Sequence, residues 1–235
     1  MNLIRKGHRQ SHRGVIGVES AIVMIAFVIV AAALAFVVLN MGFSTTQKAK
    51  TTISAGLSEA SSSLEVAGKV TGIGCTSSSK GCSTPYLNVT SVPLKIASGG
   101  DSVNLANTTA AIKYLSNTVQ YDNIYAGAVT SGTSNNVTAG FTAAKNSVCA
   151  SACTLNPVTA AVPSSTKAII YWTVNTNSNS ILDQGEHAVL AIAYKSADRP
   201  TSLDKVRAEI IVPTGAPLTV ERTVPNITSL VVDMG

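Results

Sequence analysis

Few side chains in this sequence have the type and spacing that catalysis requires. His187 is the only histidine beyond residue 14, and Asp183 and Glu186 precede it closely. A serine, a histidine and a carboxylate can form a hydrolytic triad. The sequence nevertheless contains no G-x-S-x-G, H-E-x-x-H, P-loop or G-x-G-x-x-G motif. We therefore expect no catalytic residue and no cofactor, and we interpret His187 as part of a strand.

The stretch from Asn175 to Glu186 carries oxygen-bearing side chains at alternate positions, as calcium loops do. Glu186 stands at the twelfth position, where an EF-hand has its bidentate acid. Asn175 replaces the usual first aspartate, however, and Ser180 replaces the glycine of the sharp turn. We interpret the stretch as an Asn- and Ser-rich hairpin turn with a structural role, with or without a bound cation, and predict no metal site.

Four cysteines are present, at Cys75, Cys82, Cys149 and Cys153. In an exported chain an even number favours two disulfides, and four cysteines allow three pairings. We favour the local pairs Cys75–Cys82 and Cys149–Cys153, each of which would close a short loop. Zinc is the alternative, but neither C-x6-C nor C-x3-C is a usual zinc spacing and no histidine is near either pair.

Asn-x-Ser/Thr sequons, the acceptors of N-linked glycans, occur at Asn88, Asn107, Asn136 and Asn226. None of them has proline at the middle position. A chain rich in Thr and Asn contains some sequons by chance. N-glycosylation requires a surface loop in an exported protein, and we expect at least one of the four sites to be modified.

The strongest pattern in the sequence lies near its start. Residues 21–39 contain no charge, glycine, proline or polar side chain. As a helix they span about 28 Å, close to the hydrocarbon thickness of a bilayer. Leaving their large apolar side chains in water would cost some tens of kcal/mol, so only a membrane or sister copies can cover them. Upstream lies a basic leader that contains Arg5, Lys6, Arg9 and Arg13.

The junction between this leader and the apolar run differs from that of a secretory signal peptide. Such a signal has a shorter apolar segment and a small-x-small cleavage site at its far end. Here a Gly14-Val15 junction stands before the apolar run instead. A cut at this junction removes the four basic residues and leaves the apolar helix at the new N-terminus.

Glu19 would then be the fifth residue of the mature chain, one turn from the new amine of Val15. A carboxylate among apolar helices costs several kcal/mol unless it is paired. We expect Glu19 to pair with the Val15 amine of its own or a neighbouring subunit and to serve assembly. The alternative is an acid that merely lies in the headgroup layer.

The sequence from Val15 to Gly42 resembles that of archaeal flagellins (archaellins), which are type IV pilin-like proteins. The resemblance is specific over the first quarter of the chain and weaker beyond it. It implies a class III leader, 1–14, that a prepilin-type peptidase removes between Gly14 and Val15. It also implies that the mature helices pack in a helical filament, which a membrane platform and an ATPase assemble. Type IV pilins have an assembly glutamate at the position of Glu19, whereas many archaellins lack it.

Beyond the apolar run the sequence predicts a helix that continues on one amphipathic stripe and ends near residue 70, where glycines follow. From about residue 71 to 235, short apolar runs alternate with Ser-, Thr-, Asn- and Gly-rich turns, which indicates a two-sheet sandwich. The resemblance implies an immunoglobulin-like domain. The predicted fold class is therefore α+β, with a hydrophobic helix over 15–70 followed by an antiparallel β-sandwich.

The charge pattern excludes a nucleic-acid partner. The chain has 17 Lys and Arg against 12 Asp and Glu, but four of the basic residues belong to the leader, which leaves 13 against 12. No basic cluster with interleaved aromatic residues remains to bind a phosphate backbone. Only 12% of the residues are charged, which suits a self-associated or glycan-coated surface.

Together with the resemblance, these patterns predict a non-enzymatic filament subunit on the archaeal cell surface, inserted in the cytoplasmic membrane before assembly. The resemblance implies the archaellum, the swimming filament. An adhesive archaeal type IV-like pilin would share the leader, Glu19 and the helix. A membrane-anchored surface binding module with an uncut leader is the third interpretation.

Overall fold

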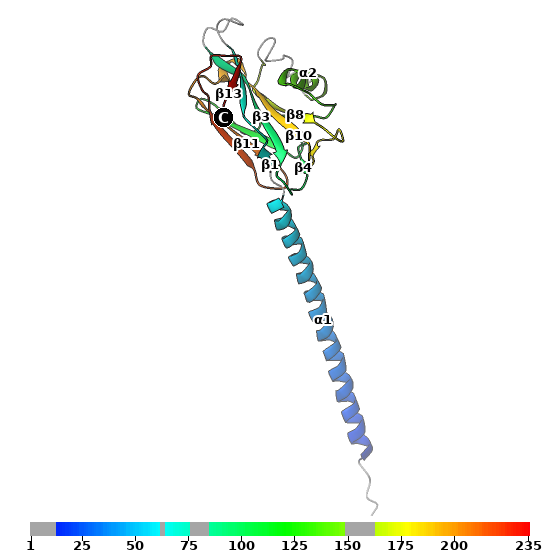
Figure 1. The fold of residues 1–235 in the computed structure, drawn as a ribbon. Helices are drawn as coiled ribbons and strands as arrows, with labels where there is room; N and C mark the ends of the chain where they lie inside the picture. The colour runs from blue at the N-terminus through cyan, green and yellow to red at the C-terminus, as the bar shows by residue number, and fades with distance from the viewer. Residues whose placement is uncertain (1–12, 62–63, 76–84, 149–162) are drawn as a thin grey trace, which may run out of the picture. The chain divides into compact units, whose positions relative to one another are not determined.

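The structure is a computed structural model that describes residues 13–61, 64–75, 85–148 and 163–235. The chain divides into two compact units, Met1–Ala55 and Gly56–Gly235. Helix α1 (Arg13–Ser61) accounts for the described part of the first unit and extends into the second (Figure 1). The rest of the second unit is a β domain, so the predicted α+β fold class is confirmed.

Helix α1 leaves its apolar surface uncovered within the chain. Every described side chain from Gly17 to Leu57 is exposed. This segment is long and apolar enough to cross a membrane, with a mean hydropathy of 3.3 in its most apolar window. It presents apolar side chains all round, as a helix does when its burial must come from outside its own chain.

The prediction that the helix extends to residue 70 is wrong. The helix ends at Ser61. Strand β1 (Leu64–Val66) lies within the range predicted as helix, and β2 (Thr71–Cys75) begins directly after it. The glycines that we interpreted as helix breakers are packing positions of β2. A Cβ on Gly72 would lie 2.8 Å from the side chain of Leu87, and one on Gly74 would lie 2.6 Å from that of Ile227.

A seven-stranded sheet forms the centre of the β domain. Its strand order is β13-β2-β3-β10-β8-β7, and β1 also pairs with β3. All pairs are antiparallel except β7 with β8, which is parallel. The additional strands of this sheet are β3 (Tyr86–Ile96), β7 (Tyr125–Val129), β8 (Lys167–Val174), β10 (His187–Ala193) and β13 (Val231–Asp233).

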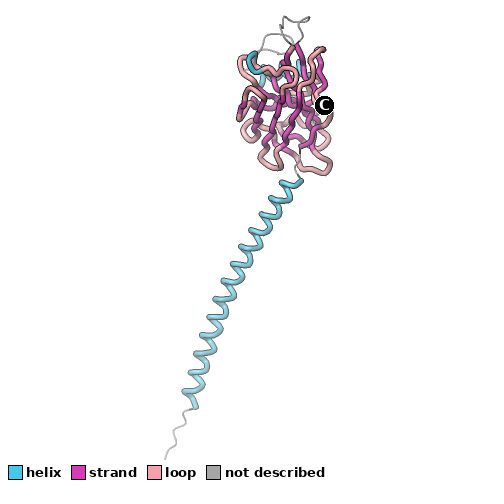
Figure 2. Tube along the Cα trace, turned by 90° about the vertical axis from the view of Figure 1, so that its left-hand side faces the viewer, coloured by secondary structure: helices cyan, strands magenta, loops and turns pink. Residues whose placement is uncertain are grey.

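A four-stranded antiparallel sheet packs against the larger one. Its order is β12-β11-β5-β6, and a separate pair, β4 with β9, joins two loops. The tube of Figure 2 shows the strands gathered in one body. The remaining elements are β4 (Val103–Asn104), β5 (Ala111–Ser116), β6 (Gln120–Tyr121), β9 (Ile181–Leu182), the 3-10 turn η1 (Ser196–Asp198), β11 (Lys205–Ile211) and β12 (Leu218–Thr223).

The main hydrophobic core lies between the two sheets. Trp172 and Leu190 of the larger sheet and Ile112 and Ile210 of the smaller one are fully buried in the same cluster. Two sheets that share one core form the sandwich predicted from the short apolar runs and the turns between them.

A second cluster covers the opposite face of the larger sheet. Helix α2 (Val137–Ser147), which the sequence analysis assigned to no element, packs Phe141 and Ala144 against Val89, Ile169 and Tyr171. The side chain of Asn136 caps the helix by accepting the N–H of Ala139 at 2.8 Å. The helical spacing of Val137, Phe141, Ala144 and Val148 is the signal that could have revealed it.

Four tyrosines are buried in these clusters. Tyr114, Tyr171 and Tyr194 are at most 2% exposed, and Tyr125 is 8% exposed. The Tyr194 hydroxyl donates to Thr90 Oγ1 at 2.8 Å. Burial raises the pKa of Tyr171 and that of Tyr194 to about 12 each, and it raises the pKa of Tyr114 and of Tyr125 further. Removal of a proton from any of them would leave a phenolate in an apolar core.

The close approach of α2 to β8 yields a first prediction. A Cβ on Gly140 would lie 2.5 Å from the ring of Tyr171, so a larger side chain has to displace the helix. Gly140→Val should lower the free energy of unfolding by about 1–3 kcal/mol. Denaturant unfolding in detergent, followed by circular dichroism, measures this. Ala139→Val, at the preceding position of the same helix, is the control. Equal losses of stability in both variants would contradict the packing argument.

The buried tyrosines predict a loss of stability in alkali. Because their folded pKa values lie above the unfolded value near 10, the unfolded chain releases these protons first as the pH rises. Stability should therefore be independent of tyrosine ionisation below about pH 10 and should fall between about pH 10 and 12. Urea midpoints measured from pH 8 to 12 test this, and a midpoint that stays constant across the range would refute it.

Candidate functional site

The N-terminal part of α1 carries one acid and an uninterrupted uncharged surface. Gly14 and Val15 lie in the first turn of the helix, and Glu19 lies four residues beyond Val15, about one turn further. Glu19 is exposed, and no charged residue follows it until Lys48. Between Gly17 and Lys48, Glu19 is therefore the only acid in a segment whose other residues suit an apolar environment.

Eighteen large apolar side chains of α1 are exposed, each between 52% and 76%. At about 1.5–3 kcal/mol for full burial of one such side chain, their combined transfer from water is worth tens of kcal/mol. This exceeds the whole folding stability of an ordinary domain. The helix is consequently an assembly or membrane surface and not a solvent-facing spacer.

Four threonine hydroxyls in the polar part of α1 find hydrogen-bond acceptors within the helix itself. The hydroxyls of Thr45 and Thr46 donate to the carbonyls of Met41 and Gly42, at 2.7 and 2.8 Å. Thr51 and Thr52 both donate to the Lys48 carbonyl at 2.9 Å. These hydroxyls are satisfied within the helix, so the threonines can be covered by another helix without leaving a polar group unpaired.

In the β domain, Glu186 organises the stretch that resembled a calcium loop. Glu186 is 1% exposed, and its carboxylate accepts the N–H of Thr176 at 2.7 Å and that of Asp183 at 3.1 Å. The indole N–H of Trp172 donates to it at 3.3 Å. The carboxylate that a cation would need as a ligand therefore already accepts three hydrogen bonds.

The asparagines of this stretch are also engaged. The side-chain oxygen of Asn175 accepts the N–H of Asn177 and of Ser178, and that of Asn179 accepts the N–H of Ile181. These are Asx turns, which supports the interpretation of a structural hairpin. Within the described ranges, no group of three or more His, Cys, Asp or Glu could hold a metal ion. His187 begins β10, so its predicted place in a strand is confirmed.

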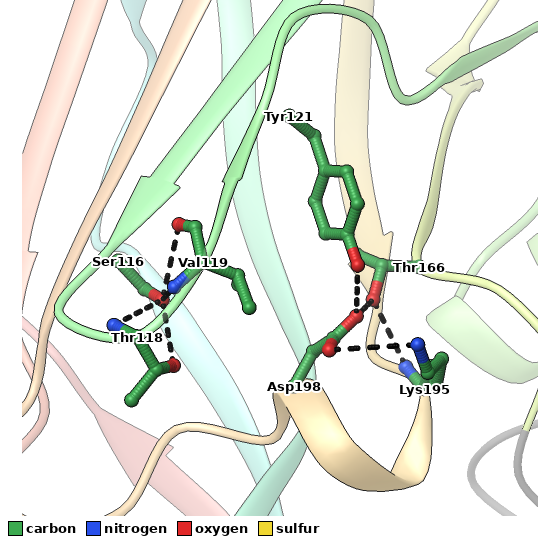
Figure 3. A network of polar contacts seen from close by, with 7 residues as sticks. All are labelled: Ser116, Thr118, Val119, Tyr121, Thr166, Lys195 and Asp198. Carbon is green, nitrogen blue, oxygen red and sulfur yellow. Dashed lines mark hydrogen bonds and ion pairs between the residues drawn. The ribbon is translucent and has the colours of Figure 1, made fainter.

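A second buried acid, Asp198, links the two sheets (Figure 3). It lies in η1 and is 4% exposed. Its Oδ2 accepts the hydroxyls of Tyr121 at 2.8 Å and Thr166 at 2.6 Å, and Lys195 Nζ lies 3.9 Å from Oδ1. The hydrogen bond to Asp198 raises the pKa of Tyr121. Tyr121 belongs to the four-stranded sheet and Thr166 directly precedes β8, so the acid ties the layers together.

The predicted modification sites lie in different surroundings. Asn107, Asn136 and Asn226 are exposed, whereas Asn88 is 8% exposed within β3. Cys75 is buried at the end of β2 and is disulfide-bonded. Cys82, Cys149 and Cys153 lie outside the described residues, so the pairing stays a prediction.

Sequence comparison places the chain among known proteins. The family model for archaeal-type flagellin matches residues 14–222. The protein called probable flagellin 1 of Aeropyrum pernix is 35% identical over 216 residues, which cover 91% of this chain and 92% of that protein. Probable flagellin 2 of Archaeoglobus fulgidus is 41% identical over 106 residues, 44% of this chain and 51% of the relative.

Two solved structures share the fold. The archaeal flagellum of Methanospirillum hungatei matches with a TM-score of 0.58 and 22% identity, over 93% of this chain and 99% of that one. The crystal structure of a flagellin from Methanocaldococcus jannaschii matches with a TM-score of 0.54 and 15% identity, over 74% and 96%. Because the family model and the Aeropyrum relative each span most of the sequence, the chain belongs to the archaeal-type flagellin family.

Proposed function

We propose that this chain is the structural subunit of an archaeal flagellar filament, which assembles helically through α1 for swimming motility. The observation that carries the proposal is the uncovered apolar surface of α1 in a member of the flagellin family. A flagellin is a structural protein and not an enzyme, and the filament is a cell-surface appendage. Copies of the same chain are the partner that covers each helix.

Before assembly, the same surface needs a membrane. The segment Gly17–Leu57 is long and apolar enough to span one, which supports insertion in the cytoplasmic membrane as the precursor state. A membrane platform and an ATPase would then supply the work of transferring the helix from lipid to filament. Since both environments are apolar, that transfer forfeits little hydrophobic free energy.

Leader removal fits the extent of the family match. The archaeal-type flagellin model begins at residue 14, next to the proposed cut between Gly14 and Val15. A prepilin-type peptidase would remove Arg5, Lys6, Arg9 and Arg13 with the leader. Glu19 would then face the new Val15 amine of its own or a neighbouring copy, and the pair would be neutral inside the filament.

An adhesive type IV-like pilin remains the second candidate, and Glu19 is the observation that favours it, because pilins use an acid at this position. The membrane-anchored binding module requires a functional cleft. Pockets lined by described residues have volumes of about 10, 100 and 260 Å³, and the buried acids Glu186 and Asp198 already have hydrogen-bond donors. We therefore rank the module last.

The cleavage proposal predicts the outcome of changing the junction. Gly14→Val should leave the precursor uncut and abolish filaments, because a branched side chain would occupy the position that the peptidase must accommodate. Gly17→Ala is the matched control, since nothing lies within 4 Å of a Cβ on Gly17. N-terminal sequencing of the protein from the membrane fraction and from sheared material measures both. Normal filaments from Gly14→Val would rule out this cleavage site.

The assembly role of Glu19 predicts a second loss. In Glu19→Ala the Val15 amine would remain unpaired among apolar helices, which costs about 3–5 kcal/mol for a buried pair that loses one member. Filament yield should therefore drop strongly, while Ser20→Ala should assemble normally. Quantitative blotting of sheared filaments against membranes measures the yield. An unchanged yield in Glu19→Ala would favour an acid that merely lies in the headgroup layer.

A further inference from the structure

The four sequons present very different surfaces to a modifying enzyme. Asn107, Asn136 and Asn226 all lie on exposed segments, in a turn, at the start of α2 and before β13. Asn88 is 8% exposed inside β3, and Thr90, the third residue of its sequon, is 4% exposed. In the folded domain one sequon is therefore buried and the other three are exposed, a difference that the sequon motif does not reveal.

Asn88 is enclosed by the strands on both sides of β3. Its carbonyl accepts the N–H of Tyr194, just beyond β10, at 3.0 Å. On the other side, β3 pairs with β2, and the register of that pair shifts between Ile73 and Gly74, at the level of Asn88. The Asn88 side-chain oxygen is itself buried. A sugar on this side chain would have to displace the groups that bury it.

The hydroxyl of the buried sequon is also engaged. Thr90 Oγ1 accepts the hydroxyl of Tyr194 at 2.8 Å, and Tyr194 is fully buried. A glycan acceptor is defined by the asparagine amide together with the Ser or Thr hydroxyl two residues later. In the folded domain the Thr90 hydroxyl is bonded to Tyr194 and Asn88 is almost fully buried, so an enzyme that must engage both groups is hindered at this sequon.

The exposed sequons keep the reacting atom available. At Asn136 the side-chain oxygen accepts the N–H of Ala139 as the helix cap, which leaves the amide nitrogen out of that contact. At Asn226 the side-chain oxygen likewise faces the Ser202 hydroxyl, at 3.4 Å. A glycan on the nitrogen is compatible with both contacts, so modification there does not disturb the fold.

We propose that glycan transfer acts on the β domain after it has folded, so that Asn88 is passed over. This rests on the proposed function as an exported filament subunit and on the expectation from its sequons that at least one site is glycosylated. In the transfer, Nδ2 forms a bond to the anomeric carbon of a sugar. The bond from that carbon to the phosphate oxygen of a glycosyl phosphate donor breaks, and the amide proton leaves with the phosphate. An unfolded chain offers all four sequons, and a glycan attached to Asn88 at that stage would have to fit where the folded domain leaves this side chain only 8% exposed.

Site-resolved mass spectrometry of peptides from sheared filaments and from the membrane fraction tests the order of events. In the wild type we expect glycans on exposed sequons and no glycan on Asn88. Ser131→Asn, which creates a fifth sequon with Thr133 in an exposed turn, should gain one glycan. This variant controls for the activity of the enzyme toward any accessible sequon.

Two destabilised variants open the buried site. Trp172→Ala removes the largest fully buried side chain, and Gly74→Val places atoms into the side chain of Ile227. In both, Asn88 should become modified in the membrane fraction. Glycan on Asn88 in wild-type filaments would overturn the proposal, as would an Asn88 that stays unmodified in both variants while exposed sequons carry glycans. Absence of glycan from every site, the new sequon included, would instead refute the proposed glycosylation itself.

Discussion

The structure depends on the burial of α1, which the chain cannot achieve alone. The eighteen exposed apolar side chains of this helix would cost tens of kcal/mol in water, more than any plausible stability of the β domain. An apolar surrounding from outside the chain therefore has to cover it, as neighbouring copies would in a filament and a bilayer would in the proposed precursor state. Each property of the helix follows from this constraint, from the absence of charge between Glu19 and Lys48 to the threonine hydroxyls that are satisfied by the helix backbone.

The β domain meets the opposite requirement, because it must be stable by itself in water. It buries a core between its sheets and a second cluster under α2. Two acids stabilise it from inside. Glu186 closes the turn between β9 and β10, and Asp198 connects a tyrosine of the small sheet to the start of β8 in the large one. Both use hydrogen-bond donors of the chain where other proteins use cations, which agrees with the turn interpretation of the Asn175–Glu186 stretch.

Much of the fold could be predicted from the sequence, since the helix and the sandwich rest on strong periodic patterns. The errors lie where a residue has two uses. Gly72 and Gly74 stop helices, yet here they allow β2 to pack closely, which only the tertiary contacts reveal. Asn136 belongs to a sequon and also caps α2, and reading it only as an acceptor hid the helix. The burial of Asn88 depends on strands far apart in sequence. The three donors to Glu186 lie within 14 residues of it, but the turn that brings them together does not follow from their spacing.

The uncharged stretch of α1 between Glu19 and Lys48 has a mechanical consequence. Contacts between apolar side chains are non-directional, so they resist separation of two helices far more than they resist a small axial slide. Polar or charged residues are what normally fix the register between packed helices. Between residues 21 and 39 no polar side chain is available for this, so the register depends on residues outside that run, such as Asn40, Gln47 and the charged residues at the two ends. A filament built on such helices can bend, with neighbouring copies slipping slightly past each other, while its core remains dry.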